Sequence, residues 1–396
     1  MYTSINNAAL LSRDDQRRAV CIVLEEGRIV EIKSQAGQNV DCAQSFDAQD
    51  LLVLPGIVDI HGDAFERQLM PRPGVYIDPA LALMETDRQM IANGITTAYH
   101  GISVSWEPGL RSISSARKIL EKILAQRPGL ACDTRIHLRF ETHALEALPA
   151  VIQWIRDGHI DLLAFNDHTD HILGQTDKPS FQVLLDRSGL SRAQFQTLLE
   201  RILRQRSRVP AAIDELARLC RTFQIPMASH DDECVDMRRH YERLGCTICE
   251  FPMTLGTARH ARRRSHAVVM GAPNILLGAS HCGRLSGKDL VSRGLCSVLS
   301  SDYFYPALNQ APMVLAAGHS CTLYEAWQLV SANAAQAAGL SDRGRIALGK
   351  RADLVILDDR SYALPRVVAT FCNGRLSYLS EADLMGGLQF SQSSAA

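Results

Sequence analysis

The sequence predicts an α/β fold, a (β/α)8 barrel of the TIM type with a small β-sandwich domain formed by both ends of the chain. Eight apolar segments of strand character recur through the middle of the chain, and helical patterns lie between several of them. Strand-like segments also occur near both termini. A barrel of this type takes about 250 residues, so a chain of 396 residues leaves room for one smaller domain.

The two ends of the chain share a pattern of short strands and turns. Residues 19–32 alternate between apolar and polar side chains around a Glu-Gly turn, and residues 344–379 contain similar runs around Gly-Lys and Asn-Gly turns. We expect these segments to pair in one small sandwich. The predicted domains are therefore residues 1–54 with 345–385 for the sandwich, and residues 55–344 for the barrel.

The middle of the chain supplies the barrel units. Helical patterns occupy residues 113–126 and 211–222, and the long polar segment 176–210 is expected to form a helical excursion over the barrel mouth. The expected barrel strands are residues 56–61, 95–103, 135–141, 162–166, 225–229, 247–251, 274–277 and 297–301.

Composition limits the classes of partner. The chain is 46% hydrophobic and 21% charged with a net charge of −1, which gives no general attraction to nucleic acid or to anionic membranes. No stretch reaches the roughly 18 apolar residues of a membrane span, and the first residues lack the apolar core of a signal peptide. The 11 cysteines form no repeated CxxC pattern, and the pair Cys246 and Cys249 lies in what reads as a buried strand. We expect a reduced, cytoplasmic protein.

Potential metal ligands stand at the ends of five expected strands. Catalytic residues of barrels come from the carboxyl ends of strands. The first strand ends in His61-Gly62-Asp63, and residues two apart in an extended chain point to the same side. One such histidine is more often structural, but the joint pattern is hard to explain by packing. The other strand-end residues are Glu141, Asp167, His168, His230, Asp231, Asp232 and Asp302.

These residue types suit metal-assisted hydrolysis. Imidazole and carboxylate ligands fit Zn, Mn, Fe or Ni, and the pattern leaves open whether one or two ions bind. A divalent ion lowers the pKa of water from about 15.7 toward 7, and a bridged pair of ions can also polarise a phosphoryl or carbonyl oxygen. Glu141 is the natural bridging candidate. Asp302 is the candidate general base, and its alternative role is a helix N-cap after the last strand.

Several motifs resemble a known family. The segment LPGIVDIHGD is similar to the first-strand motif of the amidohydrolase superfamily, and GRIALGKRADLVILD is similar to that superfamily's return to its small β domain. The stretches HGDAFERQLMPRPGV, HLRFE, NDHTD, ASHDD, EFPMTL, VVMGAPNILLGASHCG and LSSDYFYPAL resemble the phosphonate-metabolism branch, from the carbon–phosphorus lyase pathway. The resemblance covers about residues 51–356.

The resemblance implies both a ligand set and an activity. The type reaction of the branch splits a ribosyl triphosphate carrying a 1-methylphosphonate, releasing pyrophosphate and leaving the 5-phosphate. Asp63 replaces the superfamily's second histidine. The implied metal ligands are His61, Asp63, Glu141, His168, His230 and Asp302.

Three positions depart from the branch. Gly62 stands where the branch has threonine, which is expected to matter little because position 62 faces away from the metal in an extended strand. A longer loop places Asp170 and His171 near the site. Ala64 replaces an asparagine next to Asp63, which makes the substrate less secure than the branch.

A small anionic substrate needs local cations in a chain of near-zero net charge. Arg67 and Arg72 follow the first strand, and Arg72 lies in a proline-stiffened PRPG segment. His281 and Arg284 follow the seventh strand, in a region where barrels often bind phosphate. Tyr303 either lines the pocket or packs on the rim. The alternative for each arginine is a solvated side chain or a surface ion pair, and the basic run at residues 259–264 reads as a solvated helix face.

Two other functions remain open. A C–N hydrolase (an amidase, cyclic-amide hydrolase or deaminase) is compatible with the same barrel, and the longer loop and Ala64 keep this alternative open. A scaffold without metals is opposed by the complete ligand set. The role of His137 is open, and His100 is expected to be a satisfied polar residue. A homodimer is expected for a barrel enzyme of this kind.

Overall fold

Parallel strands form the central sheet of the protein, arranged in space in the same order as in the sequence. The computed structural model describes residues 2–34, 42, 44–72, 74–174, 178, 181–278, 285–360 and 364–380. Within them the sheet has eight strands. They are β6 (Ile57–Gly62), β7 (Ile95–Val104), β8 (Asp133–Glu141), β9 (Leu162–Asn166), β10 (Met227–His230), β11 (Ile248–Glu250), β12 (Ala267–Gly271) and β13 (Val298–Ser300).

The last strand returns to the first and closes the barrel. A parallel bridge joins Gly62 to Asp302, with the N–H of Asp63 bonded to the carbonyl of Asp302 at 2.9 Å and the N–H of Asp302 to the carbonyl of His61 at 3.0 Å. The buried Asp59 carboxylate accepts hydrogen bonds from the Ser301 N–H at 3.0 Å and hydroxyl at 2.5 Å. These contacts confirm the predicted barrel.

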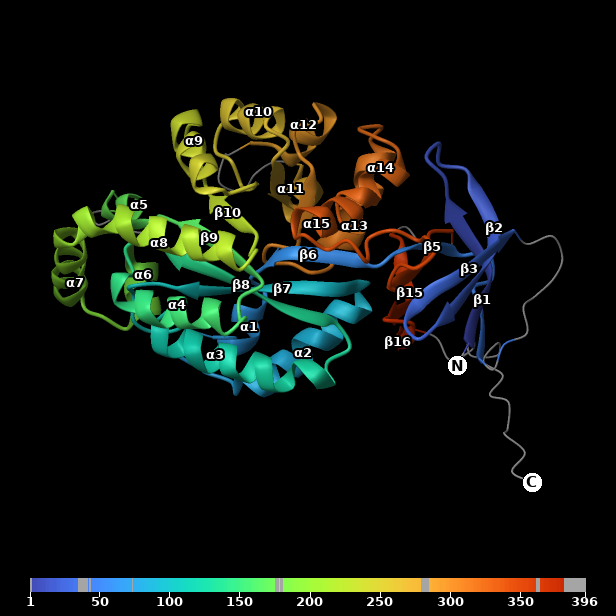
Figure 1. Ribbon diagram of the computed structural model, residues 1–396, viewed down its shortest axis with the longest axis horizontal. Helices are drawn as coiled ribbons and strands as arrows, with labels where there is room; N and C mark the ends of the chain where they lie inside the picture. The colour runs from blue at the N-terminus through green and yellow to red at the C-terminus, as the bar shows by residue number, and fades with distance from the viewer. Residues whose placement is uncertain are drawn as a thin grey trace, which may run out of the picture.

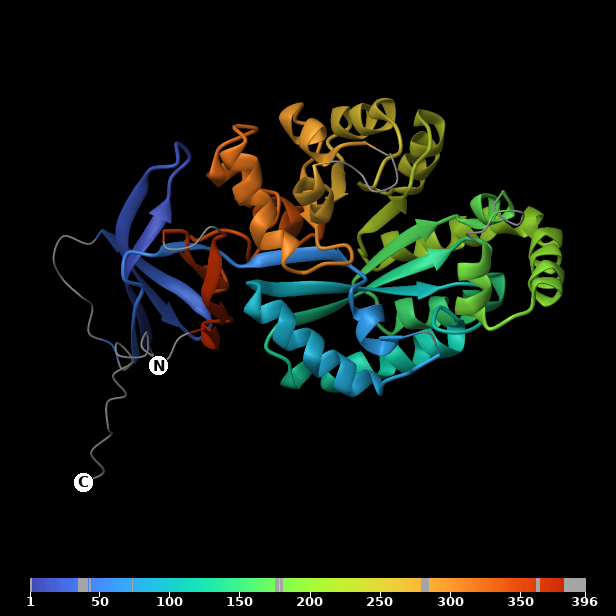
Figure 2. The ribbon, with the colours of Figure 1, turned by 180° about the vertical axis from the view of Figure 1, so that it is seen from behind.

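Helices lie on both sides of the strands (Figures 1 and 2). The helix predicted at residues 113–126 is confirmed, and the next predicted helix begins at Val209 because Pro210 fits the first turn. The helices are α1 (Phe65–Leu69), α2 (Pro79–Ala92), α3 (Ile113–Gln126), α4 (Leu148–Arg156), α5 (Thr169–Leu173), α6 (Phe181–Ser188), α7 (Arg192–Arg204), α8 (Val209–Thr222), α9 (Val235–Leu244), α10 (Leu255–Arg263), α11 (Ala272–Leu277), α12 (Gly287–Ser292), α13 (Ala307–Ala317), α14 (Leu323–Gln328) and α15 (Ala332–Ala337).

The seventh predicted strand was wrong. Residues 274–277 belong to helix α11, and the strand is β12, which precedes it. Pro273 stands in the first helical turn and Gly278, with φ of 75°, ends the helix in the left-handed conformation. A short apolar run such as Ile-Leu-Leu does not distinguish a strand from a buried helix by periodicity alone.

A second, mixed sheet is built from both ends of the chain. Its order is β16-β15-β14-β5-β1-β2-β3, with β4 paired to β1, and the antiparallel pair β5–β14 joins the two ends. Phe46 packs edge-on against Phe371 in its core, with ring centroids 5.5 Å apart. The strands are β1 (Tyr2–Leu11), β2 (Arg17–Glu25), β3 (Arg28–Ser34), β4 (Gln44–Asp47), β5 (Leu52–Pro55), β14 (Leu354–Asp358), β15 (Arg366–Cys372) and β16 (Arg375–Leu379). The exact domain boundaries stay a prediction, and residues 381–385 lie outside the described chain.

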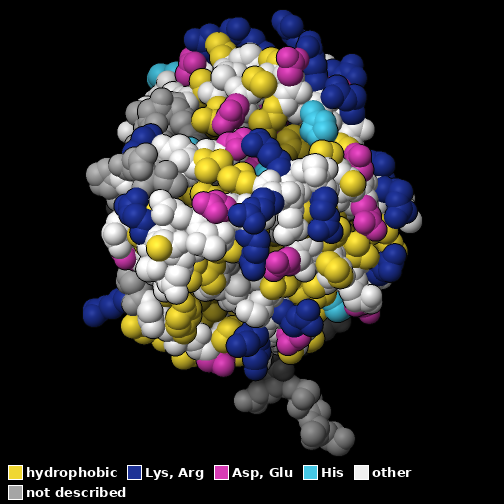
Figure 3. Space-filling view, turned by 90° about the vertical axis from the view of Figure 1, so that its left-hand side faces the viewer, with side chains coloured by type: hydrophobic (Ala, Val, Ile, Leu, Met, Phe, Trp, Pro, Cys, Tyr) yellow, Lys and Arg dark blue, Asp and Glu magenta, His cyan; other side chains and the backbone are white. Residues whose placement is uncertain are grey.

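The helical excursion lies at the end of the barrel opposite the small sheet (Figure 1). Helices α6 and α7 occupy the described part of residues 176–210, as predicted. Figure 3 views the molecule from this end, where basic and acidic side chains are interspersed. No helix within the described chain is both long enough and apolar enough to cross a bilayer.

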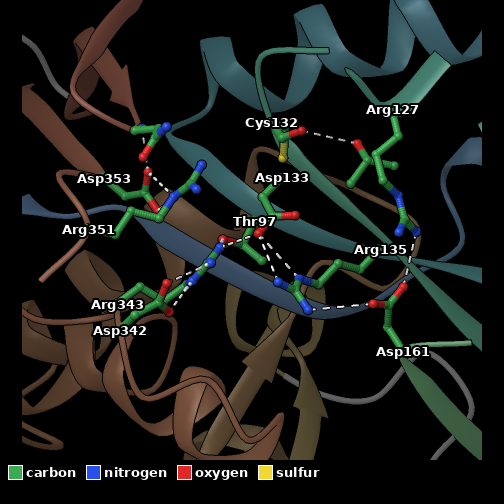
Figure 4. Close-up of polar contacts among 12 residues, drawn as sticks. Thr97, Arg127, Cys132, Asp133, Arg135, Asp161, Asp342, Arg343, Arg351 and Asp353 are labelled. Atoms are coloured by element: carbon green, nitrogen blue, oxygen red, sulfur yellow. Dashed lines mark hydrogen bonds and ion pairs between the residues drawn. The ribbon is translucent and has the colours of Figure 1, made fainter. Parts of the chain in front are cut away.

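A network of ion pairs ties the amino-terminal end of the barrel to the segment that leads into β14 (Figure 4). The Arg343 side chain is 4% exposed and donates hydrogen bonds to the Thr97 hydroxyl at 2.8 Å, to Asp133 at 2.5 Å and to Asp342 at 2.9 Å. Arg135 also binds Asp133, at 3.1 Å. Because Asp133 begins β8, the network fixes the return of the chain against the barrel floor.

Replacing Arg343 with methionine is expected to destabilise the fold. The change leaves Asp133 and Asp342 short of their buried partner, and breaking a buried ion pair from one side costs about 3 kcal/mol or more. The shift of the urea unfolding midpoint measures the effect. The control Arg293→Met removes an exposed pair with Asp289 and should cost less than about 1 kcal/mol. Equal shifts for the two variants would contradict a structural role of Arg343.

Candidate metal centre

The carboxyl ends of the barrel strands surround one pocket of about 220 Å³. It lies at the end of the barrel where the closing bridge joins β6 to the segment after β13. Six side chains that the sequence singles out line this pocket together. They are His61, Asp63, His230, Asp231, Asp302 and Tyr303.

Three buried side chains form a first group of potential ligands. His61, His137 and Glu250 offer ligand atoms that all lie within 4.8 Å of one another, and His61 Nδ1 is 3.0 Å from Glu250 Oε1. His137 Nε2 is 3.8 Å from the same Glu250 oxygen, and among the described residues the His137 nitrogens, the Glu250 oxygens and His61 Nδ1 make no well-aligned hydrogen bond. Burying polar atoms without partners is costly. Such orphaned nitrogen and oxygen atoms fit a divalent ion.

Burial also sets the charge of this group. It lowers the pKa of His61 and the pKa of His137 to about 3 each, and it raises the pKa of Glu250 to about 7. The charges of His137 and Arg139 partly offset the rise at Glu250. Neutral imidazoles have a lone pair available, which is the form that binds metal.

A second group lies beside the first. His168, His230 and Asp231 also offer atoms within 4.8 Å of one another, and the rings of His61 and His230 have centroids 5.4 Å apart. His168 Nδ1 is 2.6 Å from Glu141 Oε1. Burial opposes a charge on His168, but Glu141 and Asp231 outweigh it and raise its pKa to about 9. The predicted ligands Glu141 and His168 are therefore bound to each other at the rim of the site.

Asp302 stands where β13 meets β6. Burial and the charge of Asp63 raise the pKa of Asp302 to about 7, against the opposing effect of Arg139. The backbone of Asp302 is left-handed with φ of 54°, and Asp231 and Phe251, after β10 and β11, share this conformation with φ of 56° and 50°. Non-glycine residues in this region are uncommon and cluster at functional sites. The chain turns sharply over the pocket at three strand ends.

Close steric contacts explain why a glycine stands in the HGD motif. A Cβ at Gly62 would lie 2.8 Å from Asp59 Oδ2 and 2.9 Å from Ser301 Oγ. Position 62 thus faces away from the ligands, as expected, but it faces the hydrogen bond that closes the barrel. A larger side chain would push against that contact, and the expectation that this position matters little for the metal site stays a prediction.

Of the cations predicted for the substrate, the two that the structure describes do not line the pocket. Arg67 in α1 and Arg72 are exposed, and neither is among the residues that line the pocket. Asp170 is 60% exposed and binds Arg206 at 2.7 Å, away from the ligands. His171 is also exposed. The predicted residues His281 and Arg284 lie outside the described chain.

Sequence reasoning missed part of the site. Glu250 ends β11 and so obeys the strand-end rule, but its segment was interpreted only as a buried strand. His137 and Arg139 alternate with Glu141 along β8, and that alternation predicts one shared face. His100 is buried, and its Nε2 has no partner among the described residues, so the expectation that it is satisfied was wrong. Cys246 and Cys249 are buried and free, as expected.

Comparison with known proteins identifies the family. A model described as the amidohydrolase family matches residues 300–378. The chain is 32% identical over 336 residues to alpha-D-ribose 1-methylphosphonate 5-triphosphate diphosphatase of Escherichia coli K12, covering 82% of this chain and 88% of that protein. The chain belongs to the amidohydrolase superfamily. It is a hydrolase of that superfamily's phosphonate-metabolism branch, as the motifs predicted.

Solved structures show the same fold at low identity. N-isopropylammelide isopropylaminohydrolase from Burkholderia multivorans superposes with a TM-score of 0.65 at 17% identity, covering 95% of this chain and 98% of that one. A 5-methylcytosine deaminase from Klebsiella pneumoniae superposes with a TM-score of 0.63 at 15% identity, covering 96% and 98%. These likenesses support the barrel and the added β domain.

Metal binding is expected to stabilise the protein through Glu250. A ligand that binds only the folded state adds about 2.7 kcal/mol when its free concentration is about 100 times Kd. Adding zinc to chelator-treated protein should therefore raise the urea midpoint, and Glu250→Gln should abolish most of that rise. The control Glu242→Gln changes a carboxylate that pairs with His260 and Arg264 on the outer helices and should keep it. An undiminished rise in Glu250→Gln would contradict the assignment.

Substituting Gly271 should impair activity without unfolding the protein. A Cβ at this position would lie 2.9 Å from Asp302 Oδ2 and 3.4 Å from its Cβ, so alanine displaces the carboxylate. We expect kcat/KM to fall at least about tenfold, since small misplacements of reacting groups are costly. The control Gly256→Ala meets its nearest atom at 3.6 Å, an ordinary contact. A Gly271→Ala enzyme with normal kcat/KM would show that Asp302 tolerates displacement.

Proposed function

We propose that the protein hydrolyses ribose 1-methylphosphonate 5-triphosphate to the 5-phosphate and pyrophosphate. The observation that carries the proposal is the 32% identity, over 82% of the chain, to the Escherichia coli diphosphatase of that name. The pocket supports it with a dense set of histidines and carboxylates around one cavity. The reaction breaks a phosphoric anhydride bond with water.

The chain's own residues divide the work of the reaction. His61, His137 and Glu250 are the residues best suited to hold a divalent ion, and His168, His230 and Asp231 form the second candidate group. An ion bound there, for which zinc is the first candidate and Mn, Fe or Ni are alternatives, would make water acidic near neutral pH and offset phosphate charge. Asp63, Glu141 and Asp302 remain proposed ligands around the same cavity.

Asp302 is the proposed general base. Its carboxylate lines the pocket and stands beside Asp63, whose carboxylate is held by Arg139 at 3.2 Å. A carboxylate in this position can take the proton of an attacking water molecule. The helix N-cap role considered for it is not seen, because the next helix, α13, begins after Pro306 and has no side-chain cap.

The substrate is proposed to be a small anion. Tyr303 and Arg139 line the pocket and can contact it, whereas Arg67 and Arg72 would have to move inward to do so. The roles of Arg67, Arg72, His281 and Arg284 in substrate binding stay predictions, as do the homodimer and the cytoplasmic location.

A C–N hydrolase is the second candidate. The one arginine that lines the pocket already pairs with Asp63, so the described cavity is less basic than a triphosphate would favour. An amide, a cyclic amide or an aminated ring would need less positive charge. The same water activation serves these substrates.

A substrate panel tests the two functions. With metal-loaded protein, we expect pyrophosphate release from ribose 1-methylphosphonate 5-triphosphate and little turnover of amides, cyclic amides and aminopyrimidines. Asp302→Asn should lower kcat by about 100-fold or more, the usual scale for loss of a general base. The control Asp289→Asn alters an exposed ion pair on α12 and should leave turnover intact. Hydrolysis of a C–N substrate without pyrophosphate release would replace the first function with the second.

A further inference from the structure

The candidate pocket has two unlike sides. Its charged side chains stand near the ends of β6, β8, β10 and β13, and they are Asp63, Arg139, Asp231 and Asp302. Strands β11 and β12 lie between β10 and β13 in the sheet. The ends of these two strands, with the chain beyond them, contribute an apolar sector that consists of Phe251, Pro252, Met270, Pro273 and Leu285. A molecule in the pocket therefore meets charge on one side and apolar surface on another.

The polar side chain within the apolar sector is already engaged by the protein. Asn274 donates through Nδ2 to the Leu285 carbonyl at 3.1 Å, and its Oδ1 accepts a hydrogen bond from the Gly287 N–H at 2.8 Å. Each end of the amide thus has a partner in the segment that follows α11. Among the described residues of this sector, the side chains left for a ligand to contact are apolar.

Phe251 connects the apolar sector to the histidines of the site. Its ring packs nearly at right angles to the His61 ring, with centroids 4.9 Å apart, and lies 5.1 Å from the centroid of the His230 ring. The residue is half-buried and lines the pocket, and its N–H is bonded to the Val269 carbonyl at 3.0 Å. A molecule that reaches both histidines also meets this ring.

The backbone at Phe251 is unusual for a large side chain. Its φ of 50° lies in the left-handed region, which glycine and asparagine adopt far more readily than phenylalanine. Such strained positions persist where the surrounding structure holds them, and they cluster at ligand sites. A smaller residue would suit the turn after β11 better, so the feature gained at this position is the aromatic ring.

We infer that Phe251 determines specificity for a sugar-bearing substrate. The ribose ring lies against Phe251 and its apolar neighbours, and the triphosphate extends toward the side that carries Arg139. This orientation rests on the proposed function. The C–H groups of a furanose ring can be removed from water against an aromatic side chain, whereas a phosphate placed there would lose its hydration without gaining a partner. The two sides of the pocket thus match the two parts of the substrate.

Two substrates that differ in the sugar test this orientation. Ribose 1-methylphosphonate 5-triphosphate carries it and inorganic triphosphate lacks it, and cleavage of one anhydride bond by water releases pyrophosphate from either. The metal-loaded, unaltered enzyme should have a kcat/KM at least about tenfold higher for the ribosyl substrate. Phe251→Asn, which suits the left-handed backbone, should lower that ratio at least about fivefold and change kcat/KM for inorganic triphosphate less than about twofold.

Matched variants separate substrate contact from support of the histidines. Phe251→Leu keeps apolar surface and should retain most of the preference for the ribosyl substrate. The control Phe223→Asn replaces an exposed phenylalanine after α8 and should change neither kcat/KM. An equal loss on both substrates in Phe251→Asn would mean that the ring only supports His61 and His230, and would overturn the inference. An unchanged ratio in that variant, or no preference in the unaltered enzyme, would also overturn it.

Product binding gives a readout that needs no turnover. Calorimetry on metal-loaded protein should show the Kd of ribose 1-methylphosphonate 5-phosphate rising about tenfold in Phe251→Asn, with the Kd of pyrophosphate unchanged. Equal changes for the two products would contradict the orientation. Failure of the proposed function is a separate result, in which the unaltered enzyme releases pyrophosphate from neither substrate. If pyrophosphate is released and Phe251→Asn keeps the full preference, only the role of Phe251 fails.

Discussion

The closing contact between the first and last barrel strands is the constraint on which the site depends. Gly62 pairs with Asp302, and the buried Asp59 carboxylate holds the Ser301 backbone and hydroxyl next to it. His61 and Asp63 flank this bridge on one side and Asp302 on the other. Residues far apart in the sequence line one cavity only while this bridge between the first and last strands is formed. The contact that closes the barrel therefore lies beside the candidate site and holds its residues together.

The two groups of ionisable side chains satisfy their burial in different ways. At the rim, carboxylates and cations neutralise one another: Glu141 with His168, and Asp63 with Arg139. Deeper in the barrel, His61 and His137 face the Glu250 carboxylate at 3.0 and 3.8 Å, and their buried polar atoms make no well-aligned hydrogen bond within the described chain. Unpaired polar atoms destabilise a folded protein, whereas paired ones are close to neutral. The rim pairs therefore neutralise one another, whereas the deeper group of His61, His137 and Glu250 is suited to bind a cation.

Much of this arrangement could be predicted from strand ends, and the failures have physical causes. His61, Asp63, His230 and Asp302 gather as expected because parallel strands deliver their carboxyl ends to one rim. Arg67 does not join them. Helix α1 begins at once after β6 and buries Phe65 and Leu69, which leaves Arg67 exposed. The direction in which each side chain of such a short helix points is not encoded by spacing along an extended chain. Nor did the sequence reveal that Arg139 contacts both Asp63 and His230, since that depends on three strands at once.

The pairing of β5 with β14 has a consequence for how the protein folds during its synthesis on the ribosome. Strands β1 to β5 are synthesised first, but the sheet edge that β5 presents is covered only by β14, which is made after every barrel strand. The early strands must wait with an open edge while the barrel emerges, a state prone to wrong pairing. The Arg343 contacts lie just before β14. They would hold the returning chain against the amino-terminal end of the completed barrel, so that β14 is already positioned to pair with the free edge of β5.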